Sequence, residues 1–316
     1  MSFSAWRAAL DEVRKGRLKE LAHIPERMRM WRIAERLDAA RLHRLDEQEP
    51  FALDDLLGSP EARAGRVFLG VYSEAGLLYA FKQYGIWQHV VDVSQDEPVL
   101  RIEGTGETVQ SIRITDGPGG PEIVEVRASL RYGFGADDSV NHDLPGPRNV
   151  PWLHVEWLKL QHPYKPFPPE RARLPGQDHP GLGIGREAME MMLISGWRLG
   201  CLGVVSFPAW FHNAVLYRIH YRFVDPVEEG RFLALVDAWL TAGISLSQAS
   251  FDVDEGRVRD PEGREVYWHP GPMVAPLDER AELEHDNDWL EAVAEAHDEA
   301  SYVFPAVSGL GGSSGG

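Results

Sequence analysis

A glycine-rich segment stands directly before a helix-like stretch and could bind an anion. Gly181, Gly183 and Gly185 recur at every second position in the sequence PGLGIGR, and an apolar pattern with helical spacing follows over residues 187–199. The first N–H groups of a helix have no partner inside the helix, and they lie at the positive end of its dipole. A helix that begins here could therefore hold an anion such as a pyrophosphate. The glycines are equally compatible with a tight turn between a strand and a helix.

Two further residues have side chains suited to proton transfer. Glu156 lies between Val155 and Trp157 in the strand-like run LHVEWLKL, and these apolar neighbours could desolvate its carboxylate, as a base that works at neutral pH requires. On the other face of the same strand it would be an ordinary solvated glutamate. Tyr217 lies in a later helix-like segment. Its phenol could donate a proton, or it could be a core tyrosine with a satisfied hydroxyl.

The remaining reactive residue types favour simpler interpretations. His212 and His220 are eight residues apart without close partners, so we interpret them as surface histidines and not as metal ligands. His285 lies in a strongly acidic run, which we interpret as a solvated face. Cys201 begins an apolar run without a neighbouring His or Asp, so we place it in the core. We therefore predict no metal site.

The elements that must position these residues alternate between strands and helices. Three period-two runs with a turn at residues 116–120 predict an antiparallel meander, and a proline-rich insertion follows the next strand. The expected helices cover residues 5–21, 26–45, 74–84, 187–199, 208–217, 226–242 and 283–300, and the expected strands cover 66–72, 99–102, 108–115, 123–130, 153–160, 202–207, 221–224, 251–258 and 264–268.

Over residues 153–223 this order resembles the GNAT superfamily of acyl-CoA-dependent N-acyltransferases. The resemblance rests on the strand VEWLKL, the turn PGLGIG, the helix REAMEMMLISGWRLG, the strand GVVSF, and NAVLY followed by RF. It implies a mixed α/β fold with a GNAT-like central sheet, mixed or antiparallel, flanked by helices. In that family the glycine-rich turn binds the coenzyme A pyrophosphate through backbone amides, and two splayed strands hold the pantetheine arm.

The resemblance also implies the roles of particular residues. Glu156 would be the base and Tyr217 the general acid, and acetyl-CoA or another acyl-CoA would be the co-substrate. The cofactor-binding positions would be Leu158, Leu160, Gly181, Gly183, Ile184, Gly185 and Arg186.

The chain departs from the family pattern at several positions. Pro180 stands where the family usually has Arg or Gln, and proline has no N–H group to offer a phosphate. Residues 163–180 are inserted where the family has a short connection. The Asn that usually precedes the Tyr is displaced to Asn213, and Tyr217 to Phe223 is one residue longer than the usual spacing.

The composition indicates a soluble protein with a substantial core. The chain has 316 residues, 43% of them hydrophobic, which is enough for one large domain or two small ones. It shows no secretory signal and no apolar run of the roughly 20 residues that cross a bilayer. We therefore expect a cytoplasmic protein without a membrane partner. The single cysteine, which excludes a disulfide framework, agrees with that location.

The charge of the chain is unevenly distributed. The formal net charge of −17 disfavours nucleic acid as a partner. Residues 278–299 contain ten acidic residues and one arginine, which gives −9 for this segment alone. If this segment approaches the site, it would favour cationic amines as acceptors.

Two functions from different classes fit these observations. The first is acyl transfer from acyl-CoA to an unidentified amine. The second is a catalytically inactive GNAT-like scaffold or assembly component that binds a protein partner or forms a homo-oligomer. The predicted division is an N-terminal helical hairpin and extension over 1–50, a GNAT-like core over 51–242, a C-terminal extension with a hairpin and acidic helix over 243–300, and a flexible tail over 301–316.

Overall fold

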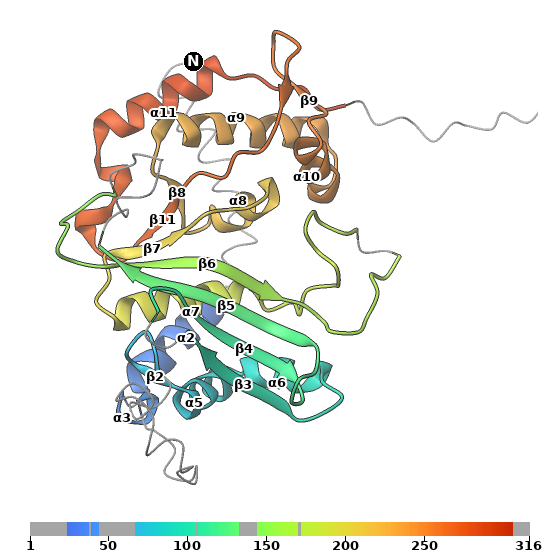
Figure 1. Cartoon of the computed structure of the whole chain (residues 1–316). Coiled ribbons are helices and arrows are strands. Elements are labelled where there is room, and N and C mark those ends of the chain that lie inside the picture. Colours follow the sequence, from blue (N-terminus) through green and yellow to red (C-terminus); the bar gives the residue numbers. More distant parts are fainter. Residues whose placement is uncertain are drawn as a thin grey trace, which may run out of the picture. The chain divides into compact units, whose positions relative to one another are not determined.

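Figure 1 shows the computed structural model of the chain, in which two compact units are distinguished. The structure describes residues 24–37, 39–43, 67–104, 107–132, 144–169 and 172–305. Among these, unit 1 takes the residues up to Tyr132 together with Arg148–Pro166 and His179–Val204, and unit 2 takes the others. The predicted first helix and the C-terminal end of the predicted tail lie outside the described residues.

Unit 1 is built on an antiparallel meander that continues into β6 (Figure 1). Its strands alternate between a buried and a solvent-facing side. In β4, for example, Ile112 and Ile114 are buried while Arg113 between them is half-buried. This period-two pattern is the one that predicted the meander, which is confirmed. The strands are β3 (Pro98–Glu103), β4 (Gln110–Asp116), β5 (Glu122–Arg131) and β6 (Trp152–Leu160).

The next strand, β7 (Gly203–Ser206), starts beside the start of β6. The Leu202 N–H group donates a hydrogen bond of 2.9 Å to the Pro151 carbonyl, and these two residues immediately precede β7 and β6. The strand order in unit 1 is β3-β4-β5-β6-β7. The boundary between the units falls within β7, whose last two residues belong to unit 2.

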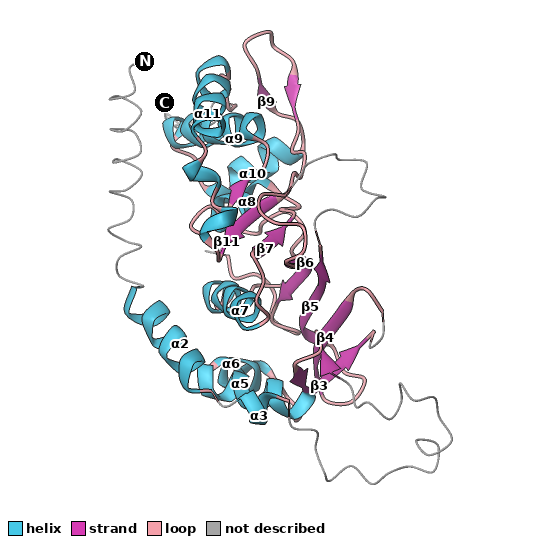
Figure 2. Cartoon of the chain, turned by 90° about the vertical axis from the view of Figure 1, so that its left-hand side faces the viewer, coloured by secondary structure: helices cyan, strands magenta, loops and turns pink. Residues whose placement is uncertain are grey.

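The helices of unit 1 cover one face of this sheet, as Figure 2 shows. Ser73 begins α5 by accepting a 3.0 Å hydrogen bond from the Gly76 N–H group, and Gly85 ends it in the left-handed conformation with φ of 83°. The predicted boundaries of this helix are confirmed. The other elements here are α2 (Ile24–Arg36), α3 (Ala39–Leu42), β1 (Val67–Phe68), β2 (Tyr72–Ser73), α5 (Glu74–Tyr84), α6 (Ile86–Val93) and α7 (Gly185–Arg198).

Unit 2 has a core of aromatic side chains. Phe223 and Phe232 lie 5.4 Å apart between ring centroids, and Trp268 lies 6.2 Å from each of them. The predicted helix over 226–242 is confirmed, because Asp225 caps its start and Gly243 ends it. The helices are α8 (Phe211–Tyr217), α9 (Pro226–Ala242), α10 (Leu246–Asp254), α11 (Asn287–Glu299) and the 3-10 turns Glu279–Ala281 and Leu283–His285.

The strands of unit 2 include one that the sequence did not indicate. β11 (Met273–Pro276) pairs antiparallel with β8 (Arg222–Phe223), next to the last part of β7. β9 (Val258–Arg259) and β10 (Glu265–Val266) form a small hairpin. The prediction of a strand from residue 251 is wrong, because α10 continues to Asp254. Ser245 caps this helix, and its buried residues Ala249 and Val253 have helical spacing.

Each unit combines helices with strands, so the mixed α/β class predicted from the sequence is confirmed. Across the described ranges, every helix is too short or too polar to cross a bilayer.

Candidate functional site

The glycine-rich turn lies at the end of β6. Gln161 and Gly181 form an isolated antiparallel bridge, and the His162 N–H group donates a 2.8 Å hydrogen bond to the Pro180 carbonyl. The proline-rich insertion therefore leaves the end of β6 and returns to pair with the two residues that follow this strand. This return sets the glycine-rich turn directly after Leu160, as the resemblance requires.

The start of α7 follows directly on the glycine-rich turn, in which Gly183 and Gly185 are exposed. Gly183 has φ of 81°, a conformation that favours glycine, and the next residue, Ile184, is buried and anchors the turn. No side chain caps α7 in the described part of the chain. A Cβ atom added at Gly183 or at Gly185 would meet nothing within 4 Å. There is therefore room for a side chain at both glycines, and Arg186 beside them is exposed.

The last residues of β6 extend beyond β7, and on that edge the Leu182 N–H group of the glycine-rich turn donates a 3.4 Å hydrogen bond to the Leu160 carbonyl. β6 has nine residues and β7 has four, and the two strands begin side by side. A strand of four residues cannot reach the Leu158–Leu160 end of its neighbour, so the backbone there extends beyond β7. On its other edge this end of β6 pairs with Val126 and Val124 of β5.

Glu156 occupies a β-bulge in the middle of β6. Trp157 pairs with Arg127 and Val155 pairs with Ala128, which leaves Glu156 as the extra residue. A bulge turns a side chain away from regular alternation and is common beside active sites. Glu156 is four residues before the end of the strand, so about 13 Å separate it from the glycine-rich turn.

The surroundings of Glu156 are polar. Its carboxylate accepts hydrogen bonds from Arg131 at 2.5 Å and from the Ser129 hydroxyl at 3.0 Å. The Glu156 side chain is 29% exposed, and Trp157 next to it is 41% exposed. Of the two environments that the sequence left open, the structure thus shows the solvated one, with a solvent-accessible ion pair, and not the desolvated one.

The same face of the sheet carries further ion pairs that the sequence analysis did not identify. Glu125 is buried, which acts to raise its pKa, but hydrogen bonds from Arg127 and Arg113 lower that pKa below its usual range. Arg113 also contacts Glu103 and Glu122, at 3.0 and 2.8 Å. The alternation of charges along β4 and β5 was a signal for this network.

Tyr217 belongs to unit 2, where it ends α8. Its ring lies 5.6 Å from that of Tyr221, and a hydrogen bond joins it to Ser206 at the end of β7. Burial raises the pKa of Tyr217, and the bond to Ser206 only partly opposes this. The phenol therefore stays protonated at neutral pH, as a proton donor must.

The interpretation of His212 as a surface residue is wrong. Its side chain is 3% exposed because α10 covers this side of α8, and its Nδ1 atom lies 2.9 Å from the Ser250 hydroxyl. Burial lowers the pKa of His212 to about 4, so the ring is neutral at pH 7. Cys201 is in the core as predicted, and burial raises its pKa to about 12.

Comparisons with known proteins give no relative: the chain matches neither a protein-family model nor a curated protein sequence. Across residues whose positions are described, no group of three or more His, Cys, Asp and Glu side chains is arranged to hold a metal ion. Within unit 1 the glycine-rich turn lies at the end of β6, and Glu156 lies four residues before that end on the same strand.

Proposed function

We propose that this protein is an acyl-CoA-dependent N-acyltransferase of GNAT type that acts on an amine. The observation that carries the proposal is the glycine-rich turn between β6 and α7, where no side chain caps the helix among the described residues and a Cβ atom at Gly183 or Gly185 would meet nothing within 4 Å. A pyrophosphate is anionic and accepts hydrogen bonds only, so it suits bare N–H groups at the positive end of a helix.

In this proposal the cofactor contacts come from the glycine-rich turn and from β6. The N–H groups of Gly183, Ile184, Gly185 and Arg186 would bind the pyrophosphate, and the exposed Arg186 side chain adds a positive charge. The backbone of Leu158 and the following residues would hold the pantetheine arm by strand-like hydrogen bonds. Pro180 contributes no N–H group, so fewer contacts are expected on that side.

The reaction needs one proton acceptor and one proton donor. As the amine nitrogen bonds to the thioester carbonyl carbon, Glu156 would accept the proton that the nitrogen loses. The carbon–sulfur bond breaks, and the departing thiolate takes up a proton, a role that the resemblance gives to Tyr217 of unit 2. Arg131 and Ser129 would orient the Glu156 carboxylate for this role.

The second candidate function is a GNAT-like scaffold without catalysis. Pro180 favours it because a phosphate contact is lost there. The ion pair between Glu156 and Arg131 also favours it, since the carboxylate is occupied by a cation before any amine arrives.

Calorimetric titration with acetyl-CoA and with free coenzyme A tests the proposal. The informative variants are Gly185→Ala and Gly185→Leu, because neither side chain meets protein atoms within 4 Å at the Cβ position and the backbone there has no positive φ. Binding should weaken modestly with alanine and disappear with leucine, while thermal unfolding stays unchanged. Absence of binding by the unmodified protein at millimolar ligand would support the scaffold instead.

A further inference from the structure

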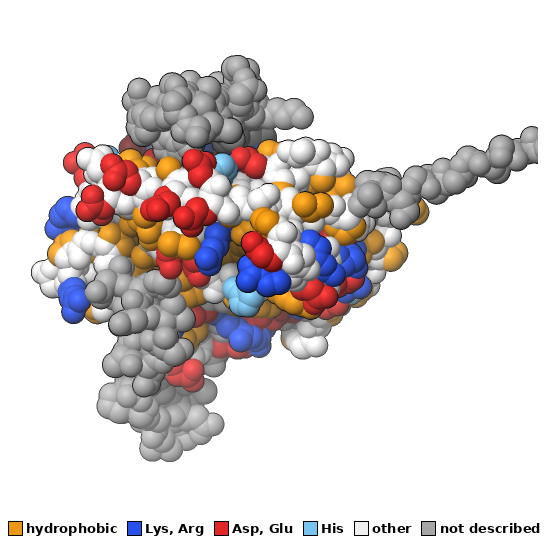
Figure 3. Space-filling model, turned by 90° about the horizontal axis from the view of Figure 1, so that it is seen from above, with side chains coloured by type: hydrophobic (Ala, Val, Ile, Leu, Met, Phe, Trp, Pro, Cys, Tyr) orange, Lys and Arg blue, Asp and Glu red, His pale blue; other side chains and the backbone are white. Residues whose placement is uncertain are grey.

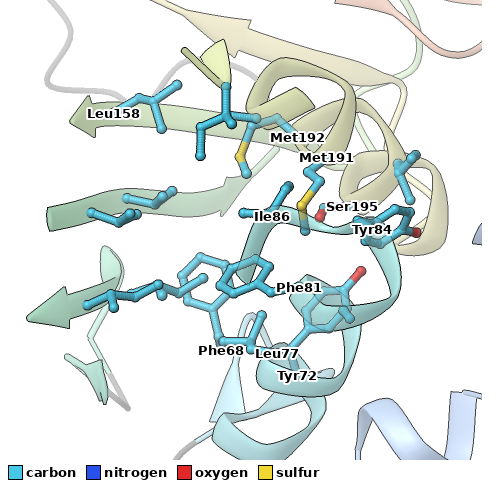
Figure 4. Close-up of a pocket in the computed structure, with 18 of the residues that line it drawn as sticks. Phe68, Tyr72, Leu77, Phe81, Tyr84, Ile86, Leu158, Met191, Met192 and Ser195 are labelled. Atoms are coloured by element: carbon cyan, nitrogen blue, oxygen red, sulfur yellow. The ribbon is translucent and has the colours of Figure 1, made fainter. Parts of the chain in front are cut away.

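An apolar cavity of about 50 Å³ lies in unit 1 between the sheet and its helices. Figure 4 shows Phe68, Leu77 and Phe81 on one side of it and Met191 and Met192 of α7 on the other. On this volume scale, one water needs about 10–15 Å³, so the cavity has room for roughly three to five non-hydrogen atoms.

The cavity shares residues with the candidate cofactor site. Leu158 and Leu160, whose backbone would hold the pantetheine arm, project their side chains into its wall. Ile184 of the glycine-rich turn and Ala188 of the first turns of α7 also line it. The cavity is therefore continuous with the strand and the turn that would carry the acyl donor.

Part of the cavity wall consists of side chains that are only half-buried. Leu158, Leu160 and Met192 are only half-buried, whereas Phe81 and Met191 are 7% and 8% exposed. These three half-buried residues belong to β6 and α7, the two elements that would flank the acyl donor. An acyl chain entering from β6 would meet apolar atoms at once.

The cavity has few polar groups, and the buried Tyr84 hydroxyl among them has no hydrogen-bond partner within the described residues. Tyr72 is hydrogen-bonded to Ser195, and Arg198 lies beside the Tyr84 hydroxyl. Burial raises the pKa of Tyr84 to about 12, so it stays neutral. The cavity therefore favours an uncharged, apolar occupant over a polar one.

We propose that this cavity receives the acyl chain of the donor, and that the preferred donor is a short or branched acyl-CoA of about four or five carbons. Beyond its carbonyl, such a chain has three or four carbons, which matches the space available, whereas acetyl has one. This inference rests on the proposed function.

The test is calorimetric titration of the full chain with coenzyme A and with acetyl-, butyryl-, isovaleryl- and octanoyl-CoA. Affinity should rise about fourfold for each methylene from acetyl to butyryl, because each buried methylene adds a constant transfer free energy. It should rise no further with octanoyl, which exceeds the cavity.

Two variants locate the effect. Ala80→Leu fills the cavity from α5, far in sequence from the cofactor positions, and should reduce butyryl-CoA binding to the level of acetyl-CoA. Met191→Ala enlarges the cavity and should move the preferred chain length upward. Ala242→Leu adds the same side chain at an exposed position of α9 and should change nothing.

The outcomes separate the two proposals. Equal affinity for all the acyl-CoA ligands, with coenzyme A still bound, would overturn the cavity assignment and leave the acyltransferase proposal intact. A gain in stability of Ala80→Leu with an unaltered acyl preference would do the same, and would identify the cavity as a packing void. Failure of coenzyme A itself to bind would overturn both.

Discussion

At the residue scale, Glu156 owes its position to the strand and its environment to distant neighbours. The bulge in β6 places its carboxylate beside Arg131 and Ser129 of β5, some 25 residues away in sequence. The sequence identified the residue type and the strand, because a glutamate between apolar residues is visible in a linear pattern. The ion pair was not visible, since it depends on the register between β5 and β6.

Replacing Glu156 with glutamine should abolish acyl transfer and leave stability almost unchanged. The loss should be about 10²- to 10⁴-fold in the rate of coenzyme A release with a panel of amines, as for removal of a general base. Because the pair with Arg131 is partly exposed, unfolding should shift by less than about 1 kcal/mol. Glu103→Gln, which removes another arginine-paired glutamate of the same face, is the matched control. A fully active Glu156→Gln would refute the base assignment.

Tyr217→Phe tests the proposed general acid separately. Loss of the phenol should slow transfer most for donors with a poor leaving group, while binding of coenzyme A remains unchanged. Tyr221→Phe is the control, because its ring lies next to that of Tyr217. Equal effects of the two variants on transfer would argue that Tyr217 has only a packing role.

At the scale of elements, local signals placed most helix ends correctly. Ser73 and Gly85 bracket α5, and Asp225 and Gly243 bracket α9, through hydrogen bonds within a few residues. By contrast, β11 has a length of four residues and no alternation, and pairing with β8 about 50 residues earlier makes it a strand. The acidic helix α11 is recognisable from its sequence. Acidic side chains gather on the face of the protein that Figure 3 shows.

The contact between α9 and α11 should depend on pH. A hydrogen bond to Asp237 at 3.1 Å raises the pKa of His297 above its usual value of 6.5, more than burial lowers it. A raised folded-state pKa gives stability that is fully present below pH 6.5 and is lost as the pH rises through the folded pKa. Asp237→Asn should remove this contribution, which urea unfolding at pH 5.5 and pH 8 can measure. An identical loss at both pH values would mean that the pair is not coupled to protonation.

At the scale of the whole molecule, each unit contains one buried histidine that resists protonation. His154 in unit 1 and His212 in unit 2 are 2% and 3% exposed. Burial lowers the pKa of each to about 4, and for His154 Arg131 adds to the effect. Each histidine therefore has a lower pKa in the folded protein than in the unfolded chain. Between these two pKa values the unfolded chain binds a proton that the folded protein does not bind.

Acid should therefore begin to destabilise both units at pH values higher than those at which carboxylates titrate. The stability associated with each histidine is present above pH 6.5 and is lost as the pH falls towards 4, by on the order of 3 kcal/mol per residue. Thermal unfolding of His154→Gln and His212→Gln between pH 7 and pH 4.5 should show a smaller loss than the unmodified chain. An unchanged pH dependence in both variants would contradict this assignment.

The sequence by itself determined the mixed α/β class, the meander, the helices at 74–84 and 226–242 and the glycine-rich turn before α7. These features depend on side-chain alternation, capping and glycine conformation, which act over a few residues. Only the tertiary structure decided that His212 is buried, that Arg131 pairs with Glu156, and that a cavity lies behind Leu158. Those properties arise from contacts between segments far apart in the chain, whose register and packing no local pattern specifies.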